Sequence, residues 1–160
     1  MEKKYINWEN IEDYSLIPIE YRFVDEVEVI PGKEAWGKKI FSSLEWYFKV
    51  HFPGNPMVPG VFLMELLQQT GMLVVTTIPE VSERLLLFHS CESMRMYSSV
   101  RPGDIVSAHV ILDSYKLGVA KMHGEVVMHN QDTGDDKLVC SMRFTLLNTQ
   151  ELTRITSKMT

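Results

Sequence analysis

The stretch that decides the fold is residues 51–71, which read HFPGNPMVPG followed by VFLMELLQQTG. Three prolines recur at three-residue spacing in the first half, and each fixes its own φ and restricts the residue before it. The first half therefore predicts a rigid loop. The second half predicts a helix with Pro59 and Gly60 at its opening turn, where proline is favoured.

The predicted helix is apolar almost all round, from Val61 to Val75. A helix without a polar face is buried, either in its own domain or in an assembly. Glu65 nevertheless lies within it, and Gln68 and Gln69 follow three and four residues later along the same side. An unpaired carboxylate in such surroundings is costly, so Glu65 must be neutralised or given a partner.

The composition is that of one globular domain. The chain has 160 residues, 45% of them hydrophobic and 23% charged, and its formal net charge is −5 without a cluster of Lys or Arg, which argues against nucleic acid as a partner. No apolar run reaches membrane-spanning length, and the first residues lack the apolar region of a signal peptide. Cys91 and Cys140 have neither metal nor redox spacing, so we expect two buried reduced thiols in a cytoplasmic protein.

We expect a single domain over residues 1–160, with an N-terminal extension (1–16) and a C-terminal tail (149–160). Apolar and polar residues alternate along several segments, as half-buried strands require. The expected strands are 21–30, 35–42, 85–96, 105–115, 119–129 and 138–146, with a short helix at 8–14 and a polar hairpin loop at 130–136. Short connections favour antiparallel pairing, so the sequence predicts an α+β fold in which an antiparallel sheet wraps one long buried helix.

The residues around this helix resemble the signature of a known enzyme family. The run at 51–61, with Glu65 and then Gln69, is similar to that of the 3-hydroxyacyl-[acyl-carrier-protein] dehydratases of the FabZ/FabA type. Further matches to the family's spacing are Phe88, Arg95 and the run VRPGD at 100–104. The resemblance extends from about residue 17 to residue 147 and is densest at 51–71.

The resemblance implies a hotdog fold, in which the sheet wraps a central helix. It also implies a homodimer, or a trimer of such dimers, in which His51 of one chain meets Glu65 of the other. The partner implied is an acyl carrier protein that bears the acyl substrate on 4'-phosphopantetheine. No metal and no organic cofactor are implied.

The family reaction removes water from a (3R)-3-hydroxyacyl thioester and gives the trans-2-enoyl thioester. A base must take the C2 proton while an acid protonates the C3 hydroxyl group. His51 suits the base because imidazole exchanges a proton near neutral pH, and Glu65 suits the acid because apolar surroundings favour a protonated carboxyl group. The Gly60 N–H, at the positive end of the helix, suits the thioester oxygen, on which negative charge develops.

The resemblance also assigns supporting roles. Gln69 would orient Glu65 or a water molecule, and the Met57 carbonyl group would hold the His51 ring in one tautomer. Candidate residues of an acyl tunnel are Phe88, Met64 and Met72, and candidate residues for docking the acidic carrier are Arg95 and Arg101. Leu87 stands where some members carry a tunnel-gating Tyr, so the acyl-chain length stays open.

Each motif residue also has a structural interpretation when it is taken alone. A His beside a Pro-Gly loop is more often a structural hydrogen-bonding residue, and Glu65 could pair with Arg95 across the core. The histidines of the later strands, His109, His123 and His129, are expected on strand surfaces or in ordinary sheet packing. Two other functions compete with dehydration, namely a hotdog acyl thioesterase and a non-catalytic subunit that binds acyl carrier.

Overall fold

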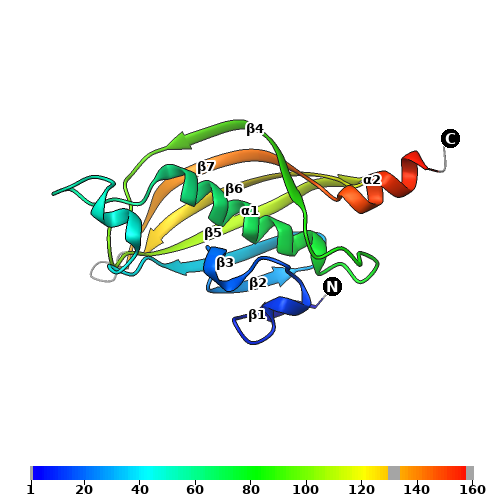
Figure 1. Cartoon of the computed structure of the whole chain (residues 1–160), viewed down its shortest axis with the longest axis horizontal. Coiled ribbons are helices and arrows are strands. Elements are labelled where there is room, and N and C mark those ends of the chain that lie inside the picture. Colours follow the sequence, from blue (N-terminus) through cyan, green and yellow to red (C-terminus); the bar gives the residue numbers. More distant parts are fainter. Residues whose placement is uncertain (1, 130–133, 158–160) are drawn as a thin grey trace.

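The computed structural model describes residues 2–129 and 134–157. These residues form one antiparallel sheet with the strand order β1-β2-β3-β5-β6-β7-β4 (Figure 1). The strands are β1 (Lys4–Ile6), β2 (Glu26–Ile30), β3 (Glu34–Ile40), β4 (Leu87–Met96), β5 (Ile105–Lys116), β6 (Val119–His129) and β7 (Asp136–Leu147). The predicted antiparallel pairing is confirmed for every neighbouring pair.

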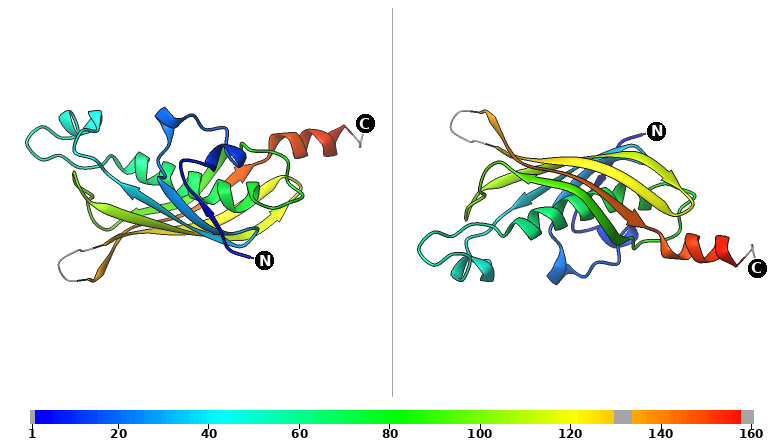
Figure 2. Two further views of the ribbon diagram at one scale, coloured as in Figure 1. Left: turned by 90° about the horizontal axis from the view of Figure 1, so that it is seen from below. Right: turned by 90° about the horizontal axis from the view of Figure 1, so that it is seen from above.

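The central element is α1 (Gly60–Thr76), with Pro59 as its N-cap. Figure 2 shows the sheet curving around this helix, which contacts β2, β3, β5, β6 and β7. Its buried side chains and the inward-facing residues of the strands form one core. The sheet that wraps a single long helix confirms the predicted α+β class and the hotdog fold.

Two glycines let α1 lie close to the sheet. A Cβ atom on Gly37 of β3 would lie 2.2 Å from Thr70 Oγ1, and one on Gly71 of α1 would lie 2.7 Å from Met122 Sδ. Real Cβ atoms do not approach other atoms so closely, so both positions need glycine. This close packing fixes the distance between α1 and the sheet, and therefore also the positions of the residues on α1.

The strand predictions hold to within a few residues, except at the first. β6 has the predicted bounds, but the strand expected at 21–30 forms only over β2; Tyr21 ends a 3-10 helix at Ile19–Tyr21, and Gln69 hydrogen-bonds the main chain of Tyr21 and Phe23. The helix expected at 8–14 shortens to a 3-10 turn at Ile11–Asp13. The hairpin loop expected at 130–136 lies partly outside the described residues.

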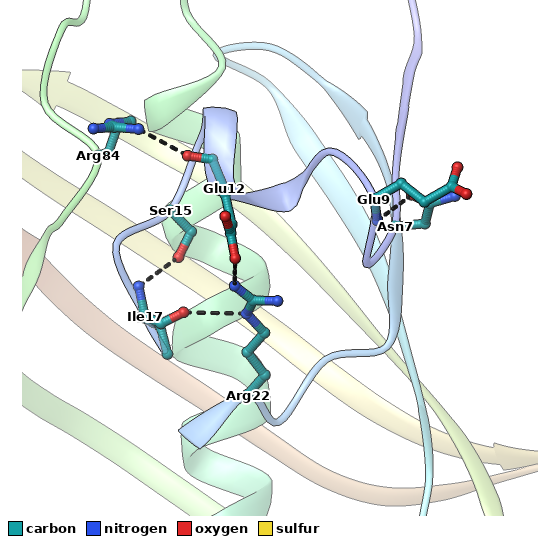
Figure 3. Close-up of polar contacts among 7 residues, drawn as sticks. All are labelled: Asn7, Glu9, Glu12, Ser15, Ile17, Arg22 and Arg84. Atoms are coloured by element: carbon teal, nitrogen blue, oxygen red, sulfur yellow. Dashed lines mark hydrogen bonds and ion pairs between the residues drawn. The ribbon is translucent and has the colours of Figure 1, made fainter. Parts of the chain in front are cut away.

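The two chain ends carry structure that the strand patterns do not predict. β1 pairs with β2 in the sheet, and α2 (Thr149–Thr156) forms within the expected C-terminal tail. The N-terminal segment is tied down by polar contacts (Figure 3): Arg84 donates to the Glu12 carbonyl oxygen at 2.8 Å, and Arg22 bridges Glu12 and the Ile17 carbonyl oxygen. The segment is therefore part of the folded domain.

The two cysteines differ in their surroundings. Cys140 is fully buried in β7, and burial raises the pKa of its thiol to about 12. Cys91 is half-buried on β4, so the expectation of two buried thiols holds for Cys140 alone. None of the helices in the described part of the chain has the length and apolar character needed to span a membrane.

Candidate active site

The proline-rich loop that follows a 3-10 helix at Trp46–Lys49 holds His51. The His51 N–H donates to the Tyr47 carbonyl oxygen at 2.8 Å, and the His51 carbonyl oxygen accepts from Met57 N–H at 2.9 Å. The His51 Nδ1 atom lies 3.1 Å from the Met57 carbonyl oxygen. A carbonyl oxygen only accepts, so Nδ1 carries the proton and Nε2 is the basic nitrogen of the neutral ring.

Arg101 braces this loop from the β4–β5 connection. Its guanidinium group donates to Asn55 Oδ1 at 2.9 Å and to the Pro56 carbonyl oxygen at 3.4 Å, while its own N–H donates to Asp104 Oδ2 at 2.7 Å. The VRPGD run therefore shapes the His51 loop in addition to making a turn. Arg95 lies exposed on β4.

His51 lines a cavity of about 370 Å³. Met57 and Gly60 line the same cavity, and a Cβ atom on Gly60 would lie only 3.7 Å from Met96 Sδ. The Gly60 N–H belongs to the first turn of α1, whose N–H groups have no partner within the helix. The cavity thus combines a basic nitrogen with a donor at the positive end of a helix.

Sequence reasoning missed several residues of the cavity wall, namely Val58, Met96, Tyr97, Ser98, Ser99 and Val100. Five of them come from the end of β4 and the turn after it. Their only signal in the sequence is the VRPGD run, which begins at Val100 and which the other four residues directly precede. The contact that brings them to the loop is a hydrogen bond from Val58 N–H to the Val100 carbonyl oxygen at 2.8 Å.

Glu65 is held by Gln69, one turn further along α1. Gln69 Nε2 donates to Glu65 Oε1 at 2.9 Å and to the Tyr21 carbonyl oxygen at 2.8 Å, and Gln69 Oε1 accepts from Phe23 N–H at 2.8 Å. The main-chain partners fix which end of the amide carries oxygen. Gln69 is only 2% exposed, so its amide is locked and one oxygen of Glu65 is held with it.

Glu65 lines a second, smaller cavity of about 30 Å³. The apolar side chains that share this cavity are Ile17, Met72, Leu86 and Leu146. Within residues 2–129 and 134–157, no cation forms an ion pair with Glu65, so the pairing with Arg95 is absent. The partner of Glu65 is a neutral amide.

The predicted site residues fall into two groups within one chain. His51, Met57 and Gly60 share the first cavity, whereas Glu65, Gln69 and Met72 share the second. Met64 is half-buried on α1 and Phe88 is exposed on β4, and neither lines these two cavities. We call the two groups the His51 half-site and the Glu65 half-site.

An aromatic cluster that sequence reasoning missed connects the two half-sites. Phe23 donates its main-chain N–H to Gln69 Oε1, and its ring packs on Phe62 of α1 with ring centroids 4.8 Å apart. Phe62 packs in turn on Tyr47 at 4.8 Å, and the Tyr47 carbonyl oxygen accepts from His51 N–H. The Gln69-bound segment and the His51 loop are thereby packed against the same face of α1.

The three histidines of the later strands each have a carboxylate partner on a neighbouring strand. The pairs are His109–Glu34 at 2.9 Å, His123–Asp113 at 2.7 Å and His129–Asp136 at 2.6 Å. Hydrogen bonds from Lys33 and His109 hold the pKa of the Glu34 carboxyl group below its usual range. None of these histidines lines either half-site cavity.

Known proteins resemble the chain across both half-sites. Residues 18–143 match the family model described as a FabA-like domain. The chain is 40% identical over 123 residues to 3-hydroxyacyl-[acyl-carrier-protein] dehydratase FabZ of Chloroflexus aggregans. The matched region covers 75% of this chain and 85% of that protein. The chain is 35% identical over 137 residues to the protein of the same name from Moorella thermoacetica, covering 84% of this chain and 94% of the relative.

Solved structures share the fold at much lower identity. The dehydratase heterocomplex ApeI:P from Xenorhabdus doucetiae matches with a TM-score of 0.56 and 15% identity, over 73% of this chain and 89% of that chain. The PaaI protein from the phenylacetic acid degradation operon of E. coli matches with a TM-score of 0.56 and 13% identity, over 74% and 79%. These similarities support the hotdog fold alone.

Proposed function

The chain belongs to the family of FabA-like domains, and from this membership we infer that it is a 3-hydroxyacyl-[acyl-carrier-protein] dehydratase of fatty-acid biosynthesis. It removes water from 3-hydroxyacyl thioesters to give enoyl thioesters, and its partner is the acyl carrier protein. The observation that carries this function is the 40% identity to a FabZ dehydratase over most of the chain. The same chain supplies a histidine base and a carboxyl acid, each fixed by a hydrogen bond at a cavity wall.

His51 is proposed as the base. Because Nδ1–H donates to the Met57 carbonyl oxygen, Nε2 has the lone pair that takes the C2 proton of the substrate. The electrons of the broken C2–H bond form the C2=C3 double bond, and charge builds transiently on the thioester oxygen. The Gly60 N–H, at the positive end of α1, is proposed to stabilise that charge.

Glu65 is proposed as the acid. Gln69 holds Oε1, which leaves Oε2 to carry the proton that the C3 hydroxyl group needs as its C–O bond breaks and water leaves. At the end of the step His51 has gained one proton and Glu65 has lost one, and transfer between them or through solvent restores the enzyme.

The complete site is proposed to form between two copies of a single-domain chain. His51 and Glu65 line different cavities of one chain, which supports a site in which each of two chains supplies one half-site. β4 supports such a dimer, because it is a ten-residue edge strand that pairs only with β7 among the described strands. Val61, 63% exposed on α1, is also available for contact with a second copy.

The carrier is proposed to dock beside the His51 half-site. Arg101 lies at the loop that carries His51, and Arg95 lies on β4, just before the residues that line the cavity. Both side chains are exposed, and their positive charge suits an acidic carrier. The acyl chain is proposed to run along Met72, with Met64 and Phe88 contributing once two chains are assembled.

Incubation with (3R)-3-hydroxyacyl-carrier thioesters of several lengths tests the function. We expect an enoyl thioester, seen as a loss of water in the product mass and as enoyl absorbance, with no free thiol released. Free thiol without enoyl product would identify a thioesterase instead, and carrier binding without turnover would identify a non-catalytic subunit. Sedimentation of the same sample separates a dimer from a trimer of dimers.

Gln69→Leu is expected to lower kcat by about tenfold to a hundredfold and to leave KM nearly unchanged, because it removes a hydrogen bond to a charged or reacting group. Steady-state kinetics of enoyl hydration measures kcat and KM separately for the variant and for wild type. Gln68→Leu is the matched control, since Gln68 lies one residue away on α1 and lines the same cavity. Equal kcat values in both variants would show that Gln69 does not position Glu65.

A further inference from the structure

The tip of the loop that carries His51 extends from one end of the molecule. Figure 1 shows this loop at one end of the long axis, before the start of α1. Residues 52–55 are all exposed, and Asn55 N–H donates to the Phe52 carbonyl oxygen at 3.0 Å, which closes the tip as a turn. The Phe52 ring stacks on the His51 ring with centroids 4.2 Å apart. The tip is therefore in contact with the proposed base, but burial in the core does not hold it in place.

Arg101 connects this tip to the rest of the domain. Its Nη1 atom donates to Asn55 Oδ1 at 2.9 Å and to the Pro56 carbonyl oxygen at 3.4 Å. Within residues 2–129 and 134–157, no other side chain forms a hydrogen bond with residues 52–56. Removal of the guanidinium group would therefore leave the tip without a side-chain hydrogen bond to the domain.

The main chain of Arg101 is itself anchored in the core. Its N–H donates to Asp104 Oδ2 at 2.7 Å, which closes the turn between β4 and β5. Phe41 N–H donates to the Asp104 carbonyl oxygen at 3.1 Å, and Gly103 N–H donates to the Phe41 carbonyl oxygen at 2.7 Å. Because the Phe41 side chain is fully buried, the guanidinium group extends from a fixed turn to an exposed loop.

The bonds of Arg101 end next to the peptide group that orients His51. The Met57 carbonyl oxygen lies 3.1 Å from His51 Nδ1, and the N–H of the same peptide group, from Val58, donates to the Val100 carbonyl oxygen at 2.8 Å. One hydrogen bond leaves a peptide group free to rotate about the bond axis. The contact of Arg101 with Pro56, the residue before Met57, supplies a second fixed point and prevents that rotation.

We propose that Arg101 is a positioning residue for His51. Its bonds to Asn55 and Pro56 keep the Met57 carbonyl group against Nδ1, so that Nε2 remains the basic nitrogen. The inference rests on the proposed function, in which His51 takes the C2 proton. It gives Arg101 an effect on the chemical step that does not need the carrier.

Hydration of a trans-2-enoyl N-acetylcysteamine thioester tests the proposal, because this substrate has neither carrier nor charge. Arg101→Met is expected to lower kcat by about tenfold to a hundredfold, as a misplaced catalytic group does, and to change KM by less than about twofold. Arg101→Lys is expected to recover part of kcat, because an ammonium group still donates to one loop acceptor. Arg143→Met is the matched control: Arg143 is exposed on β7, bonds Asp113 at 2.9 Å, and its loss is expected to leave kcat unchanged.

Asn55→Ala removes the same contact from the side of the loop. It is expected to lower kcat as Arg101→Met does, and the two losses are expected not to add. Since Asn55 and Arg101 are both exposed, the melting temperature of each variant is expected to stay within about 2 °C of wild type. In a His51→Ala background, Arg101→Met is expected to change the residual rate by less than about twofold, because no imidazole is left to position.

The tautomer of His51 gives a readout that does not depend on activity. Spectra of protein labelled with 15N-histidine, at about pH 8 where imidazole is neutral, distinguish Nδ1–H from Nε2–H rings. The His51 signal, identified by its loss from His51→Ala, is expected to show the Nδ1–H form in wild type and a mixture of both forms in Arg101→Met.

Three results would overturn the proposal. They are wild-type kcat in Arg101→Met, an equal loss of rate from Arg101→Met in the wild-type and His51→Ala backgrounds, and an unchanged Nδ1–H ring in Arg101→Met. Wild-type activity in His51→Ala would instead contradict the proposed function, and the tautomer would still show whether Arg101 orients the ring.

Discussion

His51→Ala is expected to lower kcat for hydration of a trans-2-enoyl thioester by about a hundredfold to ten-thousandfold, the contribution typical of a positioned acid–base group. The reverse reaction passes through the same transition state, so loss of the nitrogen that exchanges the C2 proton slows both directions. Absorbance of the enoyl group measures the rate. Circular dichroism is expected to be unchanged, because the His51 side chain lies in a surface loop and is half-buried.

His123→Ala is the matched control for this prediction. His123 also pairs with a neighbouring group, Asp113 at 2.7 Å, but it lies on β6 and lines neither half-site cavity. Its activity is expected to equal that of wild type. Wild-type activity in His51→Ala itself would remove His51 from the chemistry and leave it the structural role of holding the loop through Met57.

Glu65→Gln is expected to be as damaging as His51→Ala, with kcat lower by about a hundredfold to ten-thousandfold. The substitution keeps the size of the side chain, and its amide oxygen can still accept from Gln69 Nε2, so the helix and its packing are preserved. The variant has no carboxyl proton to give to the C3 hydroxyl group. Enoyl hydration by a folded, soluble Glu65→Gln protein measures the loss.

Mixed dimers test whether the two half-sites come from different chains. A dimer of one His51→Ala chain and one Glu65→Gln chain has one intact site if the site is shared, and no intact site if each chain forms its own. Random mixing makes half of the dimers mixed, and each of these keeps one site of two, so about a quarter of wild-type activity is expected. No recovery in verified mixed dimers would show that one chain holds both residues of its site.

The local patterns of the sequence determined the architecture. The proline-rich loop and the apolar run after it predict α1 and its N-terminal boundary at Pro59, because φ restriction and burial act within a few residues. The alternation that predicts β5, β6 and β7 depends on side chains pointing to opposite faces of a strand, which is also local. Glu65 stood out for the same reason, as a carboxylate in an apolar helix.

Only the tertiary structure decided how these parts meet, because the deciding contacts join residues distant in the chain. Gln69 forms hydrogen bonds with main-chain groups of Tyr21 and Phe23. These bonds hold their segment, which has strand-like alternation in the sequence, against α1 instead of in the sheet. Arg101 reaches across to Asn55 and shapes the His51 loop. Periodicity records which face of an element is apolar, but it carries no information on which distant main-chain group a buried amide or guanidinium group will satisfy. For that reason the sequence determined the helix, the strands and the candidate acid and base, whereas the fold alone revealed that one chain places them in two separate cavities.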